Sequence, residues 1–196
     1  MRILAISDIT AKYYFDYYTP GKLDSFDLIL ACGDLHQEYL EFLVTMSNKP
    51  VFYVHGNHDE GYDQAPPGGC TCIDDMIYVY QGVRILGLGG SYRYRDGKYM
   101  YTEAQMRRRI RRLWFQLRKY GGFDILVTHA PARHINDFDN LSHRGFDCFV
   151  DLLEKYKPKY FLHGHIHQTY GVHIPQKTIR GDTTIINSYD HYEFVF

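Results

Sequence analysis

The chain has 196 residues and a formal net charge of −1 at pH 7, which excludes a general electrostatic attraction to nucleic acid or to anionic lipid. Its four cysteines are too few and too scattered for a disulfide framework, and no apolar run approaches the ~20 residues that a membrane helix requires. We therefore expect one domain over residues 1–196, without a targeting segment, in the reducing cytoplasm.

Five short apolar runs predict buried strands, because they are rich in β-branched and aromatic residues and stop abruptly at polar side chains. The runs are 3–6 before Ser7 and Asp8, 28–32 before Gly33 and Asp34, 51–54 before His55, Gly56, Asn57, His58 and Asp59, 125–127 before Thr128 and His129, and 160–162 before His163, Gly164, His165, Ile166 and His167. Buried strands separated by helical stretches pair in parallel, so their carboxyl ends share one edge. The polar side chains should converge at that edge, where open α/β sheets bind ligands.

The segments between and after these runs predict helices and hairpins. A helix is expected over residues 38–47, a loop over 61–69, and a hairpin over 77–88 with Gln81 and Gly82 at its turn. Another helix, over 146–156, precedes antiparallel strands at 170–174, 178–180, 184–187 and 192–196. The strand and helix signals together indicate a mixed α/β fold.

A long helix is predicted over 102–120, with Thr102 as its N-cap and Gln105 in the capping-box position. Its buried stripe should contain Met106, Ile110, Leu113 and Leu117, with Trp114 beside them. The rest of its surface carries Arg107, Arg108, Arg109, Arg111, Arg112, Arg118 and Lys119. Such a face is usually solvated, and the near-zero net charge disfavours a dedicated nucleic-acid surface.

Two other clusters allow more than one interpretation. Tyr13, Tyr14, Tyr17 and Tyr18 follow the first strand, where they either pack the loop over the sheet or form a stacking wall for a nucleotide base. Cys70 and Cys72 could bind a soft metal ion, although a zinc site usually needs four such ligands and the sequence offers no second pair.

The order of four strings carries a specific resemblance. Gly33-Asp34, Gly56-Asn57-His58-Asp59, Thr128-His129 and Gly164-His165-Ile166-His167 resemble, from Asp8 to His167, the calcineurin-like metallophosphoesterase superfamily. The resemblance implies a four-layer α/β/β/α sandwich with a metal site at the carboxyl ends of the strands. Residues 128–131, 141–145 and 157–158 look most like the small bacterial-type phosphodiesterase members related to the brain 239 proteins.

By that resemblance, two divalent cations (Mn, Fe or Zn) share a bridging carboxylate. Asp34 would be the bridge, Asp8 and His167 would serve the first metal, and Asn57, His129 and His165 would serve the second. His58 would stand above the metals and protonate the leaving alkoxide, with Asp59 orienting its ring. The alternative for His58 is a positioning hydrogen bond to phosphate without proton transfer.

One departure from the family pattern weakens the first metal site. The family has Asp-x-His after the first strand, whereas this chain has Asp8-Ile9-Thr10, and a threonine hydroxyl is a poor replacement for imidazole. His36 could substitute as a ligand, face the substrate or cap the following helix. His143 is a candidate substrate contact.

The resemblance predicts a phosphohydrolase that cleaves a small, nucleotide-like phosphodiester, or a monoester, by attack of metal-bound hydroxide without a phosphoenzyme. Its expected partner is therefore a small phosphate ester, and the sequence does not indicate an oligomeric state. A metal-binding scaffold with one metal and little catalysis is one alternative. A nuclease that uses the arginine-rich helix is another.

Overall fold

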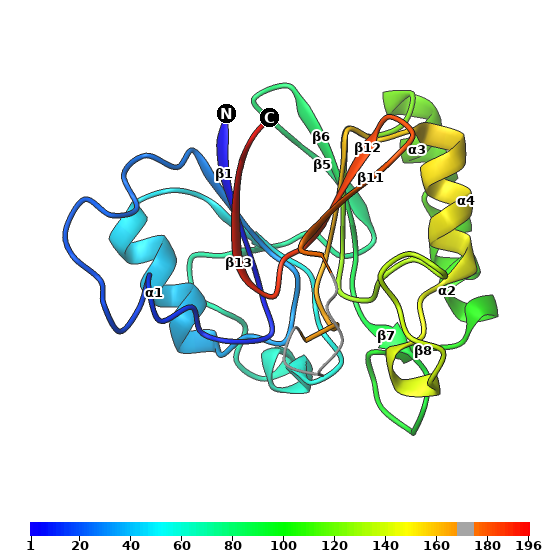
Figure 1. Cartoon of the computed structure of the whole chain (residues 1–196), viewed down its shortest axis with the longest axis horizontal. Coiled ribbons are helices and arrows are strands. Elements are labelled where there is room, and N and C mark those ends of the chain that lie inside the picture. The colour runs from blue at the N-terminus through cyan, green and yellow to red at the C-terminus, as the bar shows by residue number, and fades with distance from the viewer. Residues whose placement is uncertain (168–174) are drawn as a thin grey trace.

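Two β-sheets face each other in the computed structural model, which describes residues 1–167 and 175–196 (Figure 1). The first sheet has the strand order β13-β1-β2-β3-β4 and the second β11-β12-β10-β9-β6-β5. The first comprises β1 (Arg2–Ser7), β2 (Leu28–Ala31), β3 (Val51–Tyr53), β4 (Thr71–Cys72) and β13 (Asp190–Val195). The second comprises β5 (Met76–Tyr80), β6 (Val83–Leu88), β9 (Ile125–Thr128), β10 (Tyr160–His163), β11 (Lys177–Arg180) and β12 (Thr183–Asn187).

The interior of each sheet is parallel, as predicted. β1, β2, β3 and β4 pair in parallel, and so do β6, β9, β10 and β12. Antiparallel strands close the edges: β13 lies against β1, β5 against β6, and β11 against β12. The five predicted strands therefore run in the same sense within their sheets and bring their carboxyl ends to one side of the molecule.

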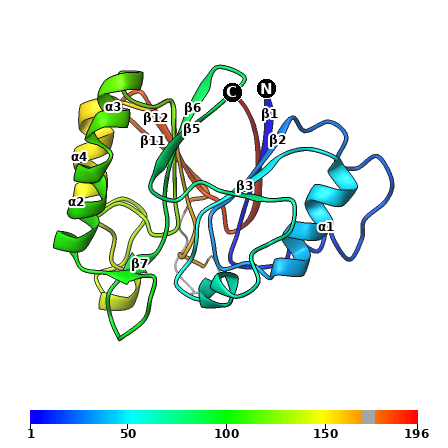
Figure 2. The same ribbon diagram turned by 180° about the vertical axis from the view of Figure 1, so that it is seen from behind.

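Three apolar clusters separate four layers, which confirms the predicted sandwich. The central cluster lies between the sheets and contains Ile3, Leu30, Val127 and Leu162. A second cluster lies between the first sheet and α1 (Gln37–Ser47). The third lies between the second sheet and the helices α2 (Glu103–Arg112), α3 (Trp114–Tyr120) and α4 (Asp147–Tyr156). Figures 1 and 2 show these helices on the opposite outer side from α1.

The predicted long helix starts correctly but is not continuous. The Thr102 hydroxyl accepts a hydrogen bond from the Gln105 backbone and the Gln105 side chain accepts one from Thr102, so the capping box is present. The helix breaks at Leu113, however, and the Gln116 side chain in α3 accepts the Ile77 backbone N–H of the edge strand β5 at 2.8 Å. Trp114, which was expected beside the apolar stripe, is 62 % exposed and lines one surface with Ile110 and Leu117.

The structure also contains several short elements that the sequence analysis did not predict. They are β7 (Ser91–Tyr92), β8 (Met100–Tyr101) and two 3₁₀ turns, Asp59–Asp63 and Leu141–His143. The hairpin turn at Gln81 and Gly82 is confirmed, with φ of 47° and 82°. The strand predicted at 170–174 lies outside the described residues. Within the described part of the chain, no helix combines the length and apolar character needed to cross a bilayer.

Two further predicted surfaces are only partly correct. Tyr14 is buried, whereas Tyr13 and Tyr17 are exposed, so only part of the tyrosine loop packs against the sheet. Arg109 is not on the solvated face: its guanidinium is buried, bonds to Asp75 at 2.9 Å and donates to the Gly89 carbonyl at 2.6 Å. Arg109 therefore holds α2 to the loop that follows β6.

A partly buried ion pair ties the second sheet to α3 and gives a test of the fold. Asp124 accepts hydrogen bonds from the Arg84 backbone and Nε, both at 2.9 Å, and Arg84 Nη1 donates to the Tyr120 carbonyl at 2.7 Å. The hydrogen bonds from Arg84 hold the pKa of Asp124 below its ordinary value. The pair therefore contributes stability above the unfolded pKa of about 3.9, and this contribution is lost as pH falls through the lower folded pKa.

We expect Asp124→Asn to lower the free energy of unfolding by about 1–2 kcal/mol at pH 7, because charge-assisted hydrogen bonds are replaced by neutral ones. The deficit relative to wild type should shrink toward zero as pH falls below about 4. Urea unfolding at a series of pH values measures both effects. Glu154→Gln, in an exposed pair with Arg180, is the control and should change stability by less than about 0.5 kcal/mol. Equal losses at pH 7 and pH 3 would contradict the assignment.

Candidate metal centre

Polar residues that follow β1, β2, β3, β9 and β10 meet at the edge where the carboxyl ends of the two sheets come together. Three of them, Asp8, Asp34 and His165, adopt left-handed backbone conformations with φ of 67°, 54° and 66°. This region is strained for residues with a β-carbon, and such strain concentrates at functional sites. The backbone therefore turns sharply just where the sequence predicts metal ligands.

Four potential ligand atoms converge around the ring of His129, which is fully buried. Its Nε2 lies 3.3 Å from Asp34 Oδ2, 3.1 Å from Asn57 Oδ1 and 3.1 Å from His165 Nδ1. The ligand atoms of Asp34, His129 and His165 all lie within 4.8 Å of one another. The structure thus brings together the bridging residue and all three residues predicted for the second metal.

The outward-facing ring nitrogens settle which atoms of the two histidines point into this cluster. His129 Nδ1 donates to the Cys32 carbonyl at 2.8 Å, and His165 Nε2 donates to the Ser142 carbonyl at 2.6 Å. In the neutral rings, His129 Nε2 and His165 Nδ1 therefore present lone pairs to each other and to two oxygens. One proton can relieve only part of this repulsion, whereas a divalent cation satisfies all four atoms. The mixed nitrogen and oxygen set suits Mn, Fe or Zn.

The pKa shifts of the cluster residues are those of a site that favours a positive charge at its centre. Burial opposes ionisation of Asp34, but the field and hydrogen bond of His129 outweigh it and hold its carboxyl pKa below the ordinary value. Burial disfavours the charged form of His129, yet Asp34 raises its pKa to about 9. Burial, together with the charge on His129, lowers the pKa of His165. The protein alone therefore places one positive charge on His129, at the position where a bound cation would serve the whole group.

The predicted first metal site is less complete. Asp8 accepts the His165 backbone N–H at 3.1 and 3.0 Å, and its Oδ1 lies 3.3 Å from His167 Nε2. Asp8 and His167 are therefore adjacent, as expected. Thr10 is half-buried. Among residues 1–167 and 175–196, its side chain makes no hydrogen bond that would hold it in position to bind a metal. The structure gives this site a carboxylate and one imidazole.

His58 lies beside the cluster as expected, but Asp59 does not orient its ring. The His58 backbone N–H donates to Asp34 Oδ1 at 2.7 Å, while His58 itself is exposed beside the cluster. Asp59 Oδ2 accepts the backbone N–H groups of Asp34 and Gly56, at 2.8 and 2.7 Å. Among the described residues no hydrogen bond joins Asp59 to the His58 ring. Asp59 therefore braces the two ligand loops against each other in place of orienting His58.

Two glycines, Gly56 and Gly164, permit this close approach of the ligand loops. A β-carbon on Gly56 would lie 2.0 Å from Asp34 Oδ1, and one on Gly164 would lie 1.9 Å from Ser7 Oγ. Neither distance is possible without displacing a ligand loop. Any larger residue at these positions would therefore open the centre.

The structure separates the two remaining histidine candidates. His36 is exposed at the N-cap of α1, makes no side-chain capping bond and is not part of the ligand cluster. His143 lies beside the centre: its ring is 5.5 Å from that of His165, and burial together with nearby His167 lowers its pKa. Its Nδ1 lies 2.8 Å from Asn140 Oδ1. His143 is therefore placed at the mouth of the cluster, and His36 is not a ligand in this arrangement.

A second group, His55 with Asp74 and Cys72, was not predicted. Asp74 Oδ2 accepts from His55 Nδ1 at 2.7 Å, and Asp74 Oδ1 accepts the Gly89 N–H at 2.7 Å. The His55 ring stacks on Tyr99 with centroids 4.3 Å apart. Burial disfavours charge on His55, but the bond to Asp74 raises its pKa to about 10. We call this His55–Asp74 pair the loop clamp, because it fixes the start of the loop that carries Asn57 and His58.

Cysteine contributes little to this clamp. Cys72 Sγ lies 3.8 Å from His55 Nδ1, so it completes a group of three potential ligands within 4.8 Å of one another. Cys70 is not part of that group, and its thiol donates to the Leu40 carbonyl. Cys70 and Cys72 therefore do not join in one ligand group, in line with the lack of a second cysteine pair in the sequence. The observed register explains the clamp, because Tyr53 pairs with Cys72 and the next residues on that face are His55 and Asp74.

Comparisons with known proteins agree with this geometry. A family model for the calcineurin-like phosphoesterase domain matches residues 1–169. UPF0046 protein C25E10.12 of Caenorhabditis elegans is 26 % identical over 187 residues, covering 80 % of this chain and 62 % of the relative. UPF0046 protein K07C11.7 of the same organism is 24 % identical over 216 residues, covering 96 % and 69 %. The chain thus spans less than two thirds of the first of these relatives.

Solved structures share the fold at low sequence identity. TT1561 of Thermus thermophilus superposes with a TM-score of 0.60 at 14 % identity, covering 96 % of this chain and 89 % of that one. A 5′-nucleotidase from Candida albicans superposes with a TM-score of 0.55 at 14 % identity, covering 95 % of this chain and 45 % of that one. At this identity the likeness concerns the arrangement of sheets and helices.

The loop clamp gives a test of how the centre is positioned. Asp74→Ala leaves the Gly89 N–H and the His55 ring without their acceptor, so we expect a loss of about 1–3 kcal/mol in the free energy of unfolding. Because the clamp supports the Asn57 loop, manganese affinity measured by calorimetry should fall about tenfold or more. Asp96→Ala, at an exposed carboxylate, is the control and should leave both quantities unchanged. Unaltered metal affinity in Asp74→Ala would show that the clamp is merely structural.

Proposed function

Because the chain belongs to the calcineurin-like phosphoesterase family, we propose that it is a metal-dependent phosphoesterase that hydrolyses a small, nucleotide-like phosphodiester. The observation that carries the proposal is the convergence of Asp34 Oδ2, Asn57 Oδ1 and His165 Nδ1 on His129 Nε2, because one multivalent cation would satisfy all four atoms together. Nitrogen and oxygen ligands from far-apart segments at the carboxyl edge of parallel strands form the kind of site that phosphoryl transfer requires.

Two cations would be held by residues already in position. Asn57, His129 and His165 would hold one, Asp8 and His167 the other, and Asp34 would lie between them. Such ions, when bound, activate water as a nucleophile and neutralise the charge of the phosphate. The chain's contribution is to fix the spacing of these ligands, through Asp59, the loop clamp and the close packing at Gly56.

His58 is the residue placed to handle a proton. Its backbone is fixed by the hydrogen bond to Asp34, while its side chain is exposed beside the cluster. An imidazole in that position can donate a proton to the leaving oxygen of the ester as the phosphorus–oxygen bond breaks. A leaving alcohol is a poor leaving group without this proton, which favours an ester of an alcohol as substrate.

Aromatic rings beside the first metal position support a nucleotide-like substrate. The ring of Tyr189 lies 4.9 Å from that of His167, and Tyr13, which is 52 % exposed, stacks at 6.3 Å on His191. Tyr189 is buried, so a base or similar planar group would stack on Tyr13 while its phosphate reaches the centre. His143 is the polar group at the opposite side of the cluster, beside His165, and we assign it a contact with the substrate.

A metal-binding scaffold is the second candidate function, favoured by the incomplete first site at Thr10. It predicts one cation per chain and no turnover with any divalent metal. A nuclease has less support, because the arginine-rich helices α2 and α3 lie on the outer face of the second sheet, away from the centre (Figure 2).

Replacing His58 tests the proposed chemistry. We expect His58→Ala to lower kcat for a chromogenic phosphodiester in manganese by about 10²–10⁴-fold, with KM and bound manganese nearly unchanged, since the residue transfers a proton and holds no metal. Lys49→Ala, at a residue near the amino-terminal edge of β3, is the control for a nonspecific loss of activity. Wild-type turnover in His58→Ala would refute the proton-transfer role, and absence of turnover in wild type at one bound metal would favour the scaffold.

A further inference from the structure

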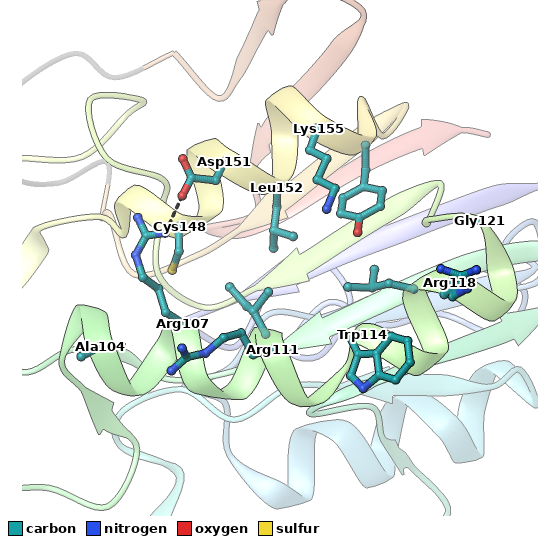
Figure 3. A pocket seen from close by; sticks show the side chains of 13 residues that line it. Ala104, Arg107, Arg111, Trp114, Arg118, Gly121, Cys148, Asp151, Leu152 and Lys155 are labelled. Carbon is teal, nitrogen blue, oxygen red and sulfur yellow. Dashed lines mark hydrogen bonds and ion pairs between the residues drawn. The ribbon is translucent and has the colours of Figure 1, made fainter.

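The outer face of the second sheet carries a groove that the proposed chemistry does not use. It lies between α2 and α3 on one side and α4 on the other and has a volume of about 890 Å³ (Figure 3). Its apolar lining includes Ile110, Trp114, Leu117, Leu152 and Tyr156. We call it the helical groove. Because the metal centre lies at the carboxyl edge of the strands, the helical groove is a separate feature of the molecule.

The apolar lining combines a buried floor with an exposed aromatic wall. Leu117 and Leu152 are buried, whereas Trp114 is 62 % exposed and contacts the equally exposed Phe115 edge to face. Trp114 lies at helical spacing from Ile110 and Leu117, so the three side chains share the face that lines the groove. Large exposed aromatic residues beside a concave apolar surface mark sites of interaction with other molecules.

The rim of the helical groove is strongly basic. Arg107, Arg111, Arg118 and Lys155 line it, against a single carboxylate, Asp151. Asp151 is already bonded to Arg107 at 2.6 Å, as the dashed line in Figure 3 shows. Among the described residues no carboxylate pairs with Arg111, Arg118 or Lys155. Three cations therefore surround an apolar floor without local compensation, in a chain whose overall net charge is only −1.

We propose that the helical groove binds an acidic amphipathic helix of a partner protein. A groove between two helices accepts a third helix, whose apolar residues at positions i, i+3, i+4 and i+7 enter the floor. Acidic residues flanking that stripe complement Arg111, Arg118 and Lys155. The floor residues Leu117 and Leu152 are recessed between the helices, where a partner's side chains reach them and a flat membrane surface does not.

The chain contains one tryptophan, Trp114, so intrinsic fluorescence reports directly on this groove. The probe is a synthetic 18-residue peptide without tryptophan, with leucines at the helical stripe and glutamates at the flanking positions. On binding, Trp114 should leave water and its emission should shift to shorter wavelength in a saturable manner. The same peptide with lysines in place of the glutamates should bind at least about tenfold more weakly, because its charges repel the rim.

Matched variants locate the binding site. The double variant Arg111→Glu and Arg118→Glu should weaken binding of the acidic peptide by about tenfold or more and remove its salt dependence. Arg108→Glu with Arg112→Glu makes the same change of charge on α2, at residues outside the groove lining, and should bind like wild type. Circular dichroism verifies that both remain folded. Phosphodiester hydrolysis should be equal in all three proteins, so the result is independent of the proposed function.

Three outcomes would overturn the proposal. They are an unshifted Trp114 emission at saturating acidic peptide, equal affinity for the acidic and basic peptides, and equal loss of binding in both double variants. Vesicles of phosphatidylcholine and phosphatidylserine are tested in parallel. A Trp114 shift with these vesicles but not with the peptide would identify the groove as a membrane contact and exclude the helix.

Discussion

The centre depends on four potential ligand atoms that the fold holds together and that a single proton on His129 satisfies only in part. His129 Nε2, His165 Nδ1, Asp34 Oδ2 and Asn57 Oδ1 come from four different segments, and none of them can turn away. Each imidazole is held by a carbonyl on its far nitrogen, from Cys32 or Ser142. Asp34 is held by the His58 backbone. A divalent cation would bind all four atoms at once, and this is the interaction that we propose for the site.

Everything around the cluster serves to keep these segments close. Asp59 ties the Asp34 loop to Gly56, and the loop clamp of His55 and Asp74 ties the same region to Gly89, which Arg109 holds from α2. The sandwich makes this possible because both sheets direct the carboxyl ends of their parallel strands to one edge. The outer helices then remain free for other contacts.

The ligands could be predicted because short apolar strands ending in Asp34, Asn57, His129 and His165 have few alternatives, and parallel pairing brings such ends together. The loop clamp could not, because it depends on β4, a two-residue strand without a sequence signal of its own. Asp59 was predicted to orient the ring of His58 because the two residues are neighbours in the sequence. In the structure a 3₁₀ turn begins at Asp59, and its carboxylate points at backbone N–H groups instead. The break at Leu113 could not be predicted either, because no glycine or proline stands there; the contact of Gln116 with β5 that accompanies it is a tertiary one.

Anomalous scattering from crystals grown with manganese tests the central claim most directly. Our account predicts a strong peak enclosed by Asp34, Asn57, His129 and His165, and a weaker one between Asp34, Asp8 and His167, where Thr10 replaces an imidazole. A map without a peak at His129 Nε2, in a protein whose four ligand side chains keep the same arrangement, would contradict it.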